Sequence, residues 1–150
     1  MVNTLKNISA YEGEPPMNLE PRSIDDGPLY AKDKVLNALT RKVVPKPFTK
    51  KCVHDLERYS LDLENDVPEL IREALTVGRF IGSEWCKGKS PKLVIACDAY
   101  SLHRKEWVQY AHKEMCFEYY VKFALKRPKN QNSEPELILI VSCHLSEERR

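Results

Sequence analysis

Residues 115–126 read MCFEYYVKFALK, and this stretch says more about the fold than any other part of the chain. Hydrophobic and polar side chains alternate through it, and a period of two predicts a strand with one buried face. We expect that face to pack on helices, and it carries the larger apolar groups: Phe117, Tyr119, Val121, Phe123 and Leu125. The opposite face carries the smaller and polar groups: Cys116, Glu118, Tyr120, Lys122 and Ala124.

A second apolar run, LILIVSCH at residues 137–144, predicts a buried strand that ends in a histidine. By alternation, one face of this strand carries His144 together with three further side chains: Ser142, Ile140 and Ile138. If the two strands are neighbours, His144 lies near Tyr120 or Lys122, although alternation alone leaves the register open. His144 could also be a structural or solvent-facing residue, and Tyr120 an ordinary cross-strand packing residue.

Helical patterns come before these strands. Apolar spacing predicts helices over residues 29–44, 50–60 and 66–78, and residues 92–100 predict a further strand. A short strand is expected near Arg79–Trp85, whereas residues 101–114 fit a loop, a short helix or a hairpin arm. Helices followed by hairpins predict an α+β fold in which the N-terminal helices pack on a small antiparallel sheet of three to four strands.

Charge and proline content set the first 30 residues of the chain apart. Residues 1–29 contain four prolines, which predicts an irregular arm, and residues 1–30 carry a net charge of −3. The whole chain has a formal net charge of +2, so the remaining body is mildly basic and could contact RNA or an acidic protein. We expect an extension over 1–49, made of the acidic arm and one helix, and an α+β domain over 50–150.

The five cysteines are widely spaced, without a Cys-x-x-Cys motif, and we expect reduced thiols in a cytoplasmic protein. Cys52 with His54 and Cys143 with His144 do not have the usual spacing of a structural zinc site, so we expect no metal. No apolar run approaches the roughly 18–20 residues of a membrane span, and no membrane contact is expected.

The strand ends carry a family resemblance. Tyr120-Val121-Lys122 and Ser142-Cys143-His144 resemble the C-terminal half of the MqsR-like and RelE-like messenger-RNA interferases, toxins of bacterial toxin–antitoxin pairs, where the pattern is Tyr-Leu-Lys and then Ser-Phe-Lys. CDAY at 97–100 is similar to a Gln-Asp-Val-Tyr stretch of that family, and residues 53–80 resemble a His-x-x-x-Arg helix of the same broad class. The resemblance covers roughly residues 50–148.

The resemblance implies a RelE-like fold and a metal-independent endoribonuclease without a cofactor, restrained by a cognate antitoxin protein and acting on RNA, with the ribosome as a further possible partner. His144 stands where the family has a lysine, and Cys97 stands where it has a glutamine. The expected catalytic residues are His144, Tyr120, Lys122, His54 and Arg58. The expected substrate-binding residues are Lys87, Lys89, Tyr100, Arg104 and Trp107.

The chemistry explains these residue types. RNA carries its own nucleophile, the 2′-OH, so a metal-free enzyme removes one proton, neutralises the phosphorane and protonates the 5′-oxygen. Histidine suits either proton transfer, tyrosine can donate a hydrogen bond to the phosphate, and lysine or arginine supplies charge. Trp107 or Tyr110 could stack on an exposed base.

Two other functions fit the sequence. The replacements at Cys97 and His144 favour a non-catalytic RNA- or protein-binding module of a phage or mobile element. A third reading is a cysteine–histidine enzyme acting through Cys97.

Overall fold

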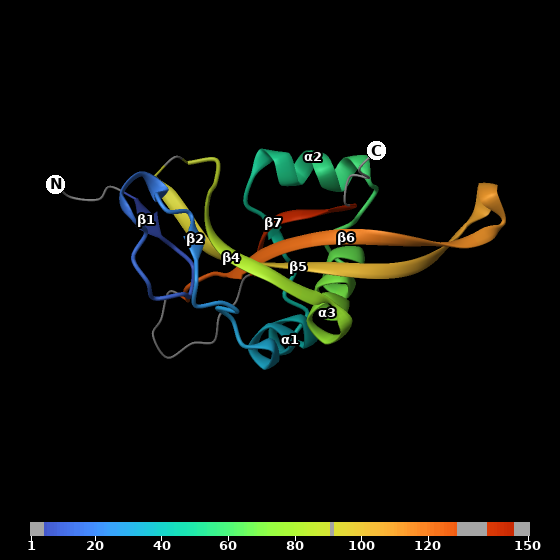
Figure 1. Cartoon of the computed structure of the whole chain (residues 1–150), viewed down its shortest axis with the longest axis horizontal. Helices are drawn as coiled ribbons and strands as arrows, with labels where there is room; N and C mark the ends of the chain where they lie inside the picture. Colours follow the sequence, from blue (N-terminus) through green and yellow to red (C-terminus); the bar gives the residue numbers. More distant parts are fainter. Residues whose placement is uncertain (1–4, 91, 129–137, 146–150) are drawn as a thin grey trace.

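The computed structural model describes residues 5–90, 92–128 and 138–145, and it contains three α-helices in this part of the chain (Figure 1). The helices are α1 (Lys32–Thr40), α2 (Lys50–Arg58) and α3 (Asp66–Val77). α3 contacts the sheet and α1 contacts α3. α2 packs mainly against strand β7 (Ile138–Leu145). None of the described helices has the length and apolar character needed to span a membrane.

The described residues form a sheet of seven strands in the order β2-β4-β5-β6-β7-β3, with β1 added on β5. Four long strands pair antiparallel as a meander: β4 (Arg79–Lys87), β5 (Leu93–Val108), β6 (Lys113–Leu125) and β7 (Ile138–Leu145). Three two-residue strands complete it: β1 (Lys6–Asn7), β2 (Ser23–Ile24) and β3 (Lys46–Pro47). The α+β prediction is confirmed, but the expected three to four strands were too few.

The undecided segment 101–114 is a hairpin arm. β5 runs on to Val108, a 3₁₀ turn η2 (Gln109–Ala111) follows, and β6 returns from Lys113. His112 has φ = 51°, a left-handed conformation that lets the chain reverse direction in few residues. The two strands therefore project beyond the helices as a ribbon (Figure 1).

The alternating stretch at 115–126 forms β6, and its predicted buried face is confirmed. Tyr119, Val121, Phe123 and Leu125 belong to the main core, and Phe117 packs partly buried against it. Phe123 stacks on Tyr100 of β5 with ring centroids 5.9 Å apart. This face packs against α3, which buries the apolar side of its own helix: Val67, Leu70, Ile71, Ala74 and Leu75.

A β-bulge corrects the predicted faces of β7. Lys122 pairs with Ser142, but its neighbour Phe123 pairs with Ile140, so one extra residue is inserted in β7. Ile140 is consequently buried beside Phe123, on the face opposite His144, and the prediction that they share a face was wrong. The side chain of Ile138, predicted for the same face, lies outside the described part of the structure.

The described part of the N-terminal segment is largely irregular, as predicted, but short strands within it also join the sheet. β1 pairs with β5, β2 pairs with β4, and β3 pairs with β7. A second core cluster joins Leu19 to Trp85, Val94 and Ala96, and the Tyr11 ring lies 5.8 Å from the Trp85 ring. Segments before and after residue 50 therefore share one sheet.

Asp98 ties this segment to the body. Its carboxylate accepts hydrogen bonds from the Leu29 and Tyr30 backbone N–H groups at 2.9–3.1 Å and from the Ser83 hydroxyl at 2.7 Å. Burial raises the pKa of the Asp98 carboxyl, and these hydrogen bonds oppose the rise only in part. Asp98 is thus a structural anchor.

Candidate functional site

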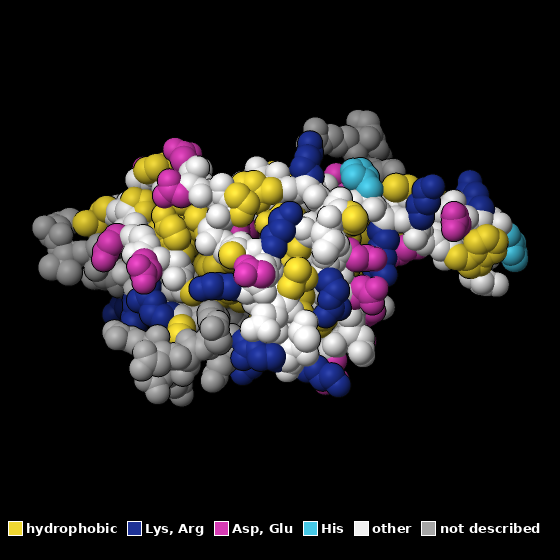
Figure 2. Space-filling view, turned by 90° about the horizontal axis from the view of Figure 1, so that it is seen from below, with side chains coloured by type: hydrophobic (Ala, Val, Ile, Leu, Met, Phe, Trp, Pro, Cys, Tyr) yellow, Lys and Arg dark blue, Asp and Glu magenta, His cyan; other side chains and the backbone are white. Residues whose placement is uncertain are grey.

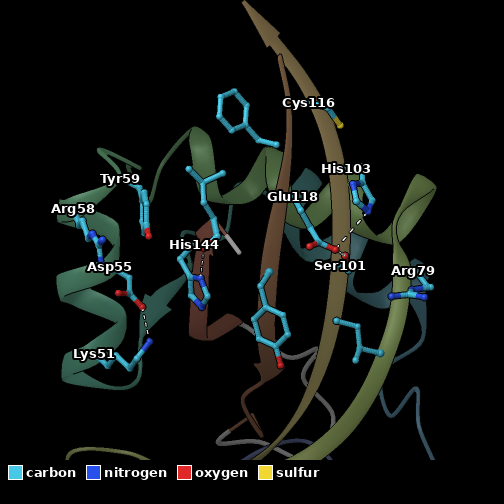
Figure 3. A pocket seen from close by; sticks show the side chains of 14 residues that line it. Lys51, Asp55, Arg58, Tyr59, Arg79, Ser101, His103, Cys116, Glu118 and His144 are labelled. Atoms are coloured by element: carbon cyan, nitrogen blue, oxygen red, sulfur yellow. Dashed lines mark hydrogen bonds and ion pairs between the residues drawn. The ribbon is translucent and has the colours of Figure 1, made fainter. Parts of the chain in front are cut away.

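A groove of about 1060 Å³ lies on the sheet face away from α3, beside α2 (Figure 3). Its floor comes from β4, β5, β6 and β7, and α2 forms one wall. Fourteen residues line it: Lys51, Asp55, Arg58, Tyr59, Arg79, Ile81, Ser101, His103, Cys116, Phe117, Glu118, Tyr120, His144 and Leu145. Three of them, Tyr120, His144 and Arg58, are predicted catalytic residues.

Strand register brings Tyr120 and His144 together. They are directly paired across β6 and β7, and their rings stack with centroids 5.6 Å apart and planes at 26°. Ser101 pairs with Tyr120 from β5, and His103 pairs with Glu118, so alternation places all five side chains on one face. The bulge at Val141 is what allows β7 to bury Ile140 and still present His144 to this face.

His144 has a defined hydrogen-bond geometry. Its Nδ1 lies 2.8 Å from the carbonyl oxygen of Leu145. A carbonyl can only accept, so this contact assigns the ring hydrogen to Nδ1. In the neutral imidazole Nε2 is then the acceptor, which is the arrangement that a general base requires.

A second histidine shares the groove. The Glu118 carboxylate accepts a hydrogen bond from the Ser101 hydroxyl at 2.7 Å, and His103 Nε2 lies 3.4 Å from the same carboxylate oxygen. The imidazolium form of His103 would make an ion pair here, with a proton directed into the groove region (Figure 3). Because both side chains are well exposed, the pair contributes little to stability.

Two arginines in the groove carry charge without a carboxylate partner among the described residues. Arg58 lies over the Tyr59 ring, with the guanidinium carbon 5.3 Å from its centroid, and Arg79 stands on the opposite side of the groove (Figure 3). Lys51, in contrast, pairs with Asp55 at 3.0 Å, one helical turn along α2. The guanidinium groups are therefore the groups available for an anion such as phosphate.

Tyr120 is kept as a phenol. Burial raises its pKa, and the nearby ammonium of Lys122 opposes that rise only in part. Lys122 itself does not line the groove; it forms an ion pair with Glu84 and lies 6.0 Å from the Tyr120 ring centroid. Burial lowers the pKa of Lys122, but Cys86 and Glu84 raise it by more, so the ammonium form is favoured. Lys122 contacts the site through Tyr120.

The remaining predicted residues lie elsewhere. Tyr100 is buried in the core and Arg104 pairs with Glu73 of α3 at 3.3 Å, because both are even-numbered on β5 and point away from the groove. Lys87 is eight residues from Arg79 along β4, about 26 Å, and Lys89 follows it. Neither Tyr100 nor Arg104 lines this groove.

His54 and Trp107 also lie outside the groove. His54 is exposed on α2, one residue before the groove-lining Asp55. Trp107 is exposed on the hairpin arm. Cys97 is completely buried, burial raises its pKa well above the usual value, and its thiol neighbour is Cys86 rather than a histidine. That environment contradicts a cysteine nucleophile.

Among the acidic, basic and histidine side chains that line the groove, sequence reasoning missed five: Lys51, Asp55, Arg79, His103 and Glu118. The pattern Ser101-x-His103-x-Lys105-x-Trp107 alternates as a strand does, and it was the available signal for His103. The described residues contain no group of three or more His, Cys, Asp or Glu side chains placed to hold a metal ion.

No protein-family model matches the sequence, and comparisons with curated proteins and with solved structures give no match. The resemblance to messenger-RNA interferases stays a prediction. A function for this chain is therefore argued from the groove itself.

Proposed function

We propose that the groove binds RNA and cleaves it by attack of the 2′-OH on the neighbouring phosphate, without a metal. The observation that carries this proposal is the stacked Tyr120–His144 pair, which shares the groove with two arginines that have no carboxylate partner among the described residues. A titratable base, a phenol donor and guanidinium groups are the types of group that this reaction requires.

The roles follow from the hydrogen bonds. His144 Nε2 accepts the 2′-OH proton as the P–O2′ bond forms, since Nδ1 is occupied by the Leu145 carbonyl. Tyr120 donates a hydrogen bond to a non-bridging phosphate oxygen, and Arg58 or Arg79 neutralises the added charge. The products are a 2′,3′-cyclic phosphate and a 5′-OH.

His103 is suited to protonate the leaving group. The imidazolium, paired with Glu118, gives its proton to the 5′-oxygen as the P–O5′ bond breaks. His144 and His103 are two strands apart and two residues apart along the sheet, which separates their Cα atoms by about 12 Å. Two imidazoles reaching inward over that span can contact one phosphate from opposite sides.

A non-catalytic binding module is the second candidate. The groove also holds the carboxylates of Asp55 and Glu118, which repel phosphate and attract basic groups. The same groove could therefore bind a basic protein segment. Absence of cleavage together with tight binding of a partner protein would favour this candidate.

The decisive test incubates the purified protein with end-labelled RNA in EDTA and identifies the product ends. We expect cyclic-phosphate products, a loss of about 10²–10⁴-fold in rate for His144→Ala and for His103→Ala, and about 10- to 150-fold for Tyr120→Phe. The matched control is His54→Ala, because His54 is exposed on α2 and does not line the groove.

Cleavage that survives unchanged in the double variant His144→Ala, Tyr120→Phe would contradict the site. Cleavage that EDTA abolishes would contradict the metal-free mechanism. Growth arrest on expression, relieved by His144→Ala, would extend the result to a toxin-like role.

A further inference from the structure

The hairpin arm is the largest feature that the groove chemistry leaves unused. Beyond the groove, β5 and β6 continue from Lys105 to Val108 and from Lys113 to Met115 without a helix over them (Figure 1). Figure 2 shows hydrophobic side chains exposed near the end of the arm, with Lys or Arg and His side chains beside them. Trp107 is 59% exposed and Tyr110 is 87% exposed.

Trp107 faces the same side as the groove. Alternation on β5 places Ser101, His103, Lys105 and Trp107 on one face. Ser101 is opposite Tyr120, and Trp107 is six residues further along, about 20 Å away. A continuous strip of sheet surface therefore leads from the candidate catalytic residues to the Trp107 ring.

The Trp107 ring has a fixed polar contact. Its indole N–H donates a hydrogen bond to the Gln109 side-chain oxygen at 3.1 Å, which orients the ring from the turn that follows. The next residue, Val108, points to the other face and is buried. The exposed ring is thus held by the arm rather than absorbed into the core.

The arm is shaped for a flat ligand. Two strands lie about 5 Å apart, so the ribbon is far too narrow to bury the roughly 800 Å² per partner of a stable protein interface. A single base, in contrast, needs only one ring face, and every base has one. Lys105 on the same face provides a cation for a backbone. Lys113 pairs with Val108 and so belongs to the other face, and the partner of Trp107 across the ribbon is Glu114.

We propose that the arm is a stacking platform for single-stranded RNA: a base stacks on Trp107 while the same strand continues along the strip into the groove. This inference rests on the proposed function, because it assigns that site its substrate class. Unpaired RNA fits and duplex does not, since only unstacked bases offer a free ring face. The 20 Å span corresponds to at most about six nucleotides at helical spacing, and fewer in an extended strand.

The experiment measures binding in a His144→Ala background, which keeps the RNA intact. The chain has two tryptophans, and Trp85 is only 3% exposed, so quenching of intrinsic fluorescence by RNA reports on Trp107. The probes are an unstructured 12-nucleotide RNA, a 3-nucleotide RNA of the same composition and a 12-base-pair RNA duplex. We expect quenching by the 12-mer and much weaker quenching by the duplex.

The affinity for RNA is then measured by fluorescence anisotropy for three variants, two in the arm and one control. Trp107→Ala should weaken 12-mer binding about 5- to 150-fold and leave 3-mer binding in the groove within twofold, because only the longer strand reaches the arm. Trp107→Phe should retain most of the affinity. The control is Val77→Ala, which removes a similarly exposed apolar side chain at the end of α3. Because α3 packs on the opposite face of the sheet from the groove, this substitution should not change the affinity for either RNA.

Equal 12-mer affinity in wild type and Trp107→Ala would overturn the platform even if RNA is cleaved. Trp107-dependent self-association or capture of a protein, without RNA quenching, would overturn it as well. Trp107-dependent 12-mer binding without any cleavage would support the platform and defeat only the catalytic proposal. Absence of all RNA binding would defeat both.

Discussion

The two halves of β5 differ although they form one strand. From Val94 to Leu102 every residue is buried, whereas from His103 to Trp107 exposed and half-buried residues alternate. The first half lies inside a sheet covered by the N-terminal segment and by α3. The second half leaves the body as one side of the arm. The candidate groove lies where the two halves meet. Its residues on β5 therefore adjoin the buried half of the strand on one side and the exposed half on the other.

The contrast between the buried and exposed halves of β5 can be tested by replacing each of the two tryptophans with alanine. Trp85 pairs with Ala96 on the buried half and packs with Leu19, Val94 and the Tyr11 ring. We expect Trp85→Ala to lower the free energy of unfolding by about 3–5 kcal/mol, because it empties a site filled from three segments. Urea unfolding followed by circular dichroism measures the loss.

Amide hydrogen exchange shows which part of the Trp85→Ala variant loses stability. β1 hydrogen-bonds to the backbone around Val94, so amides near Ile8 should lose protection when Trp85 is removed. A loss below 1 kcal/mol with unchanged exchange would mean that the N-terminal segment does not depend on this cluster.

Substitution of Asp98, also in the buried half of β5, should lower the free energy of unfolding by less. Asp98→Asn leaves a single oxygen for three donors, and we expect a loss of about 1–3 kcal/mol at neutral pH. Since the folded-state pKa of Asp98 is raised, its protonation favours the folded state. The stability advantage of wild type over Asp98→Asn is therefore greatest below the unfolded value near 3.9 and falls as pH rises through the folded pKa.

Urea titrations of both proteins between pH 4 and 7 would reveal this slope. Glu14→Gln, an exposed carboxylate on the same N-terminal segment, should stay within about 0.5 kcal/mol of wild type. A wild-type advantage that grows with pH would contradict the assigned direction.

Local pattern was sufficient to predict the long elements. The alternation of β6 and the helical spacing of α3 are carried by many residues, so the faces they bury follow directly. The two-residue strands β1 and β2 could not be found this way, because two residues have no periodicity. Their pairing depends on contacts with strands some 60–90 residues later.

The candidate site was predictable only where it depends on alternation. Alternation predicted that His144 lies near Tyr120 or Lys122 if their strands are neighbours, and the register of the structure pairs it with Tyr120. The bulge at Val141 is a property of two strands, so one strand's pattern could not reveal that Ile140 turns inward. Lys51 and Asp55 reach the groove because packing sets the orientation of α2, which its sequence alone leaves open.

The arm should show the smallest effect on stability. Trp107→Ala removes a ring that is mostly exposed and whose hydrogen bond to Gln109 stays within the turn. We expect a change within about 0.5 kcal/mol in urea unfolding, roughly a tenth of the effect of Trp85→Ala. A loss of 2 kcal/mol or more would mean that the arm packs on the body in solution. A near-zero change would show that the fold gains almost nothing from the exposed indole, so that any loss of RNA affinity in Trp107→Ala is a loss of contact with the RNA and not of folding.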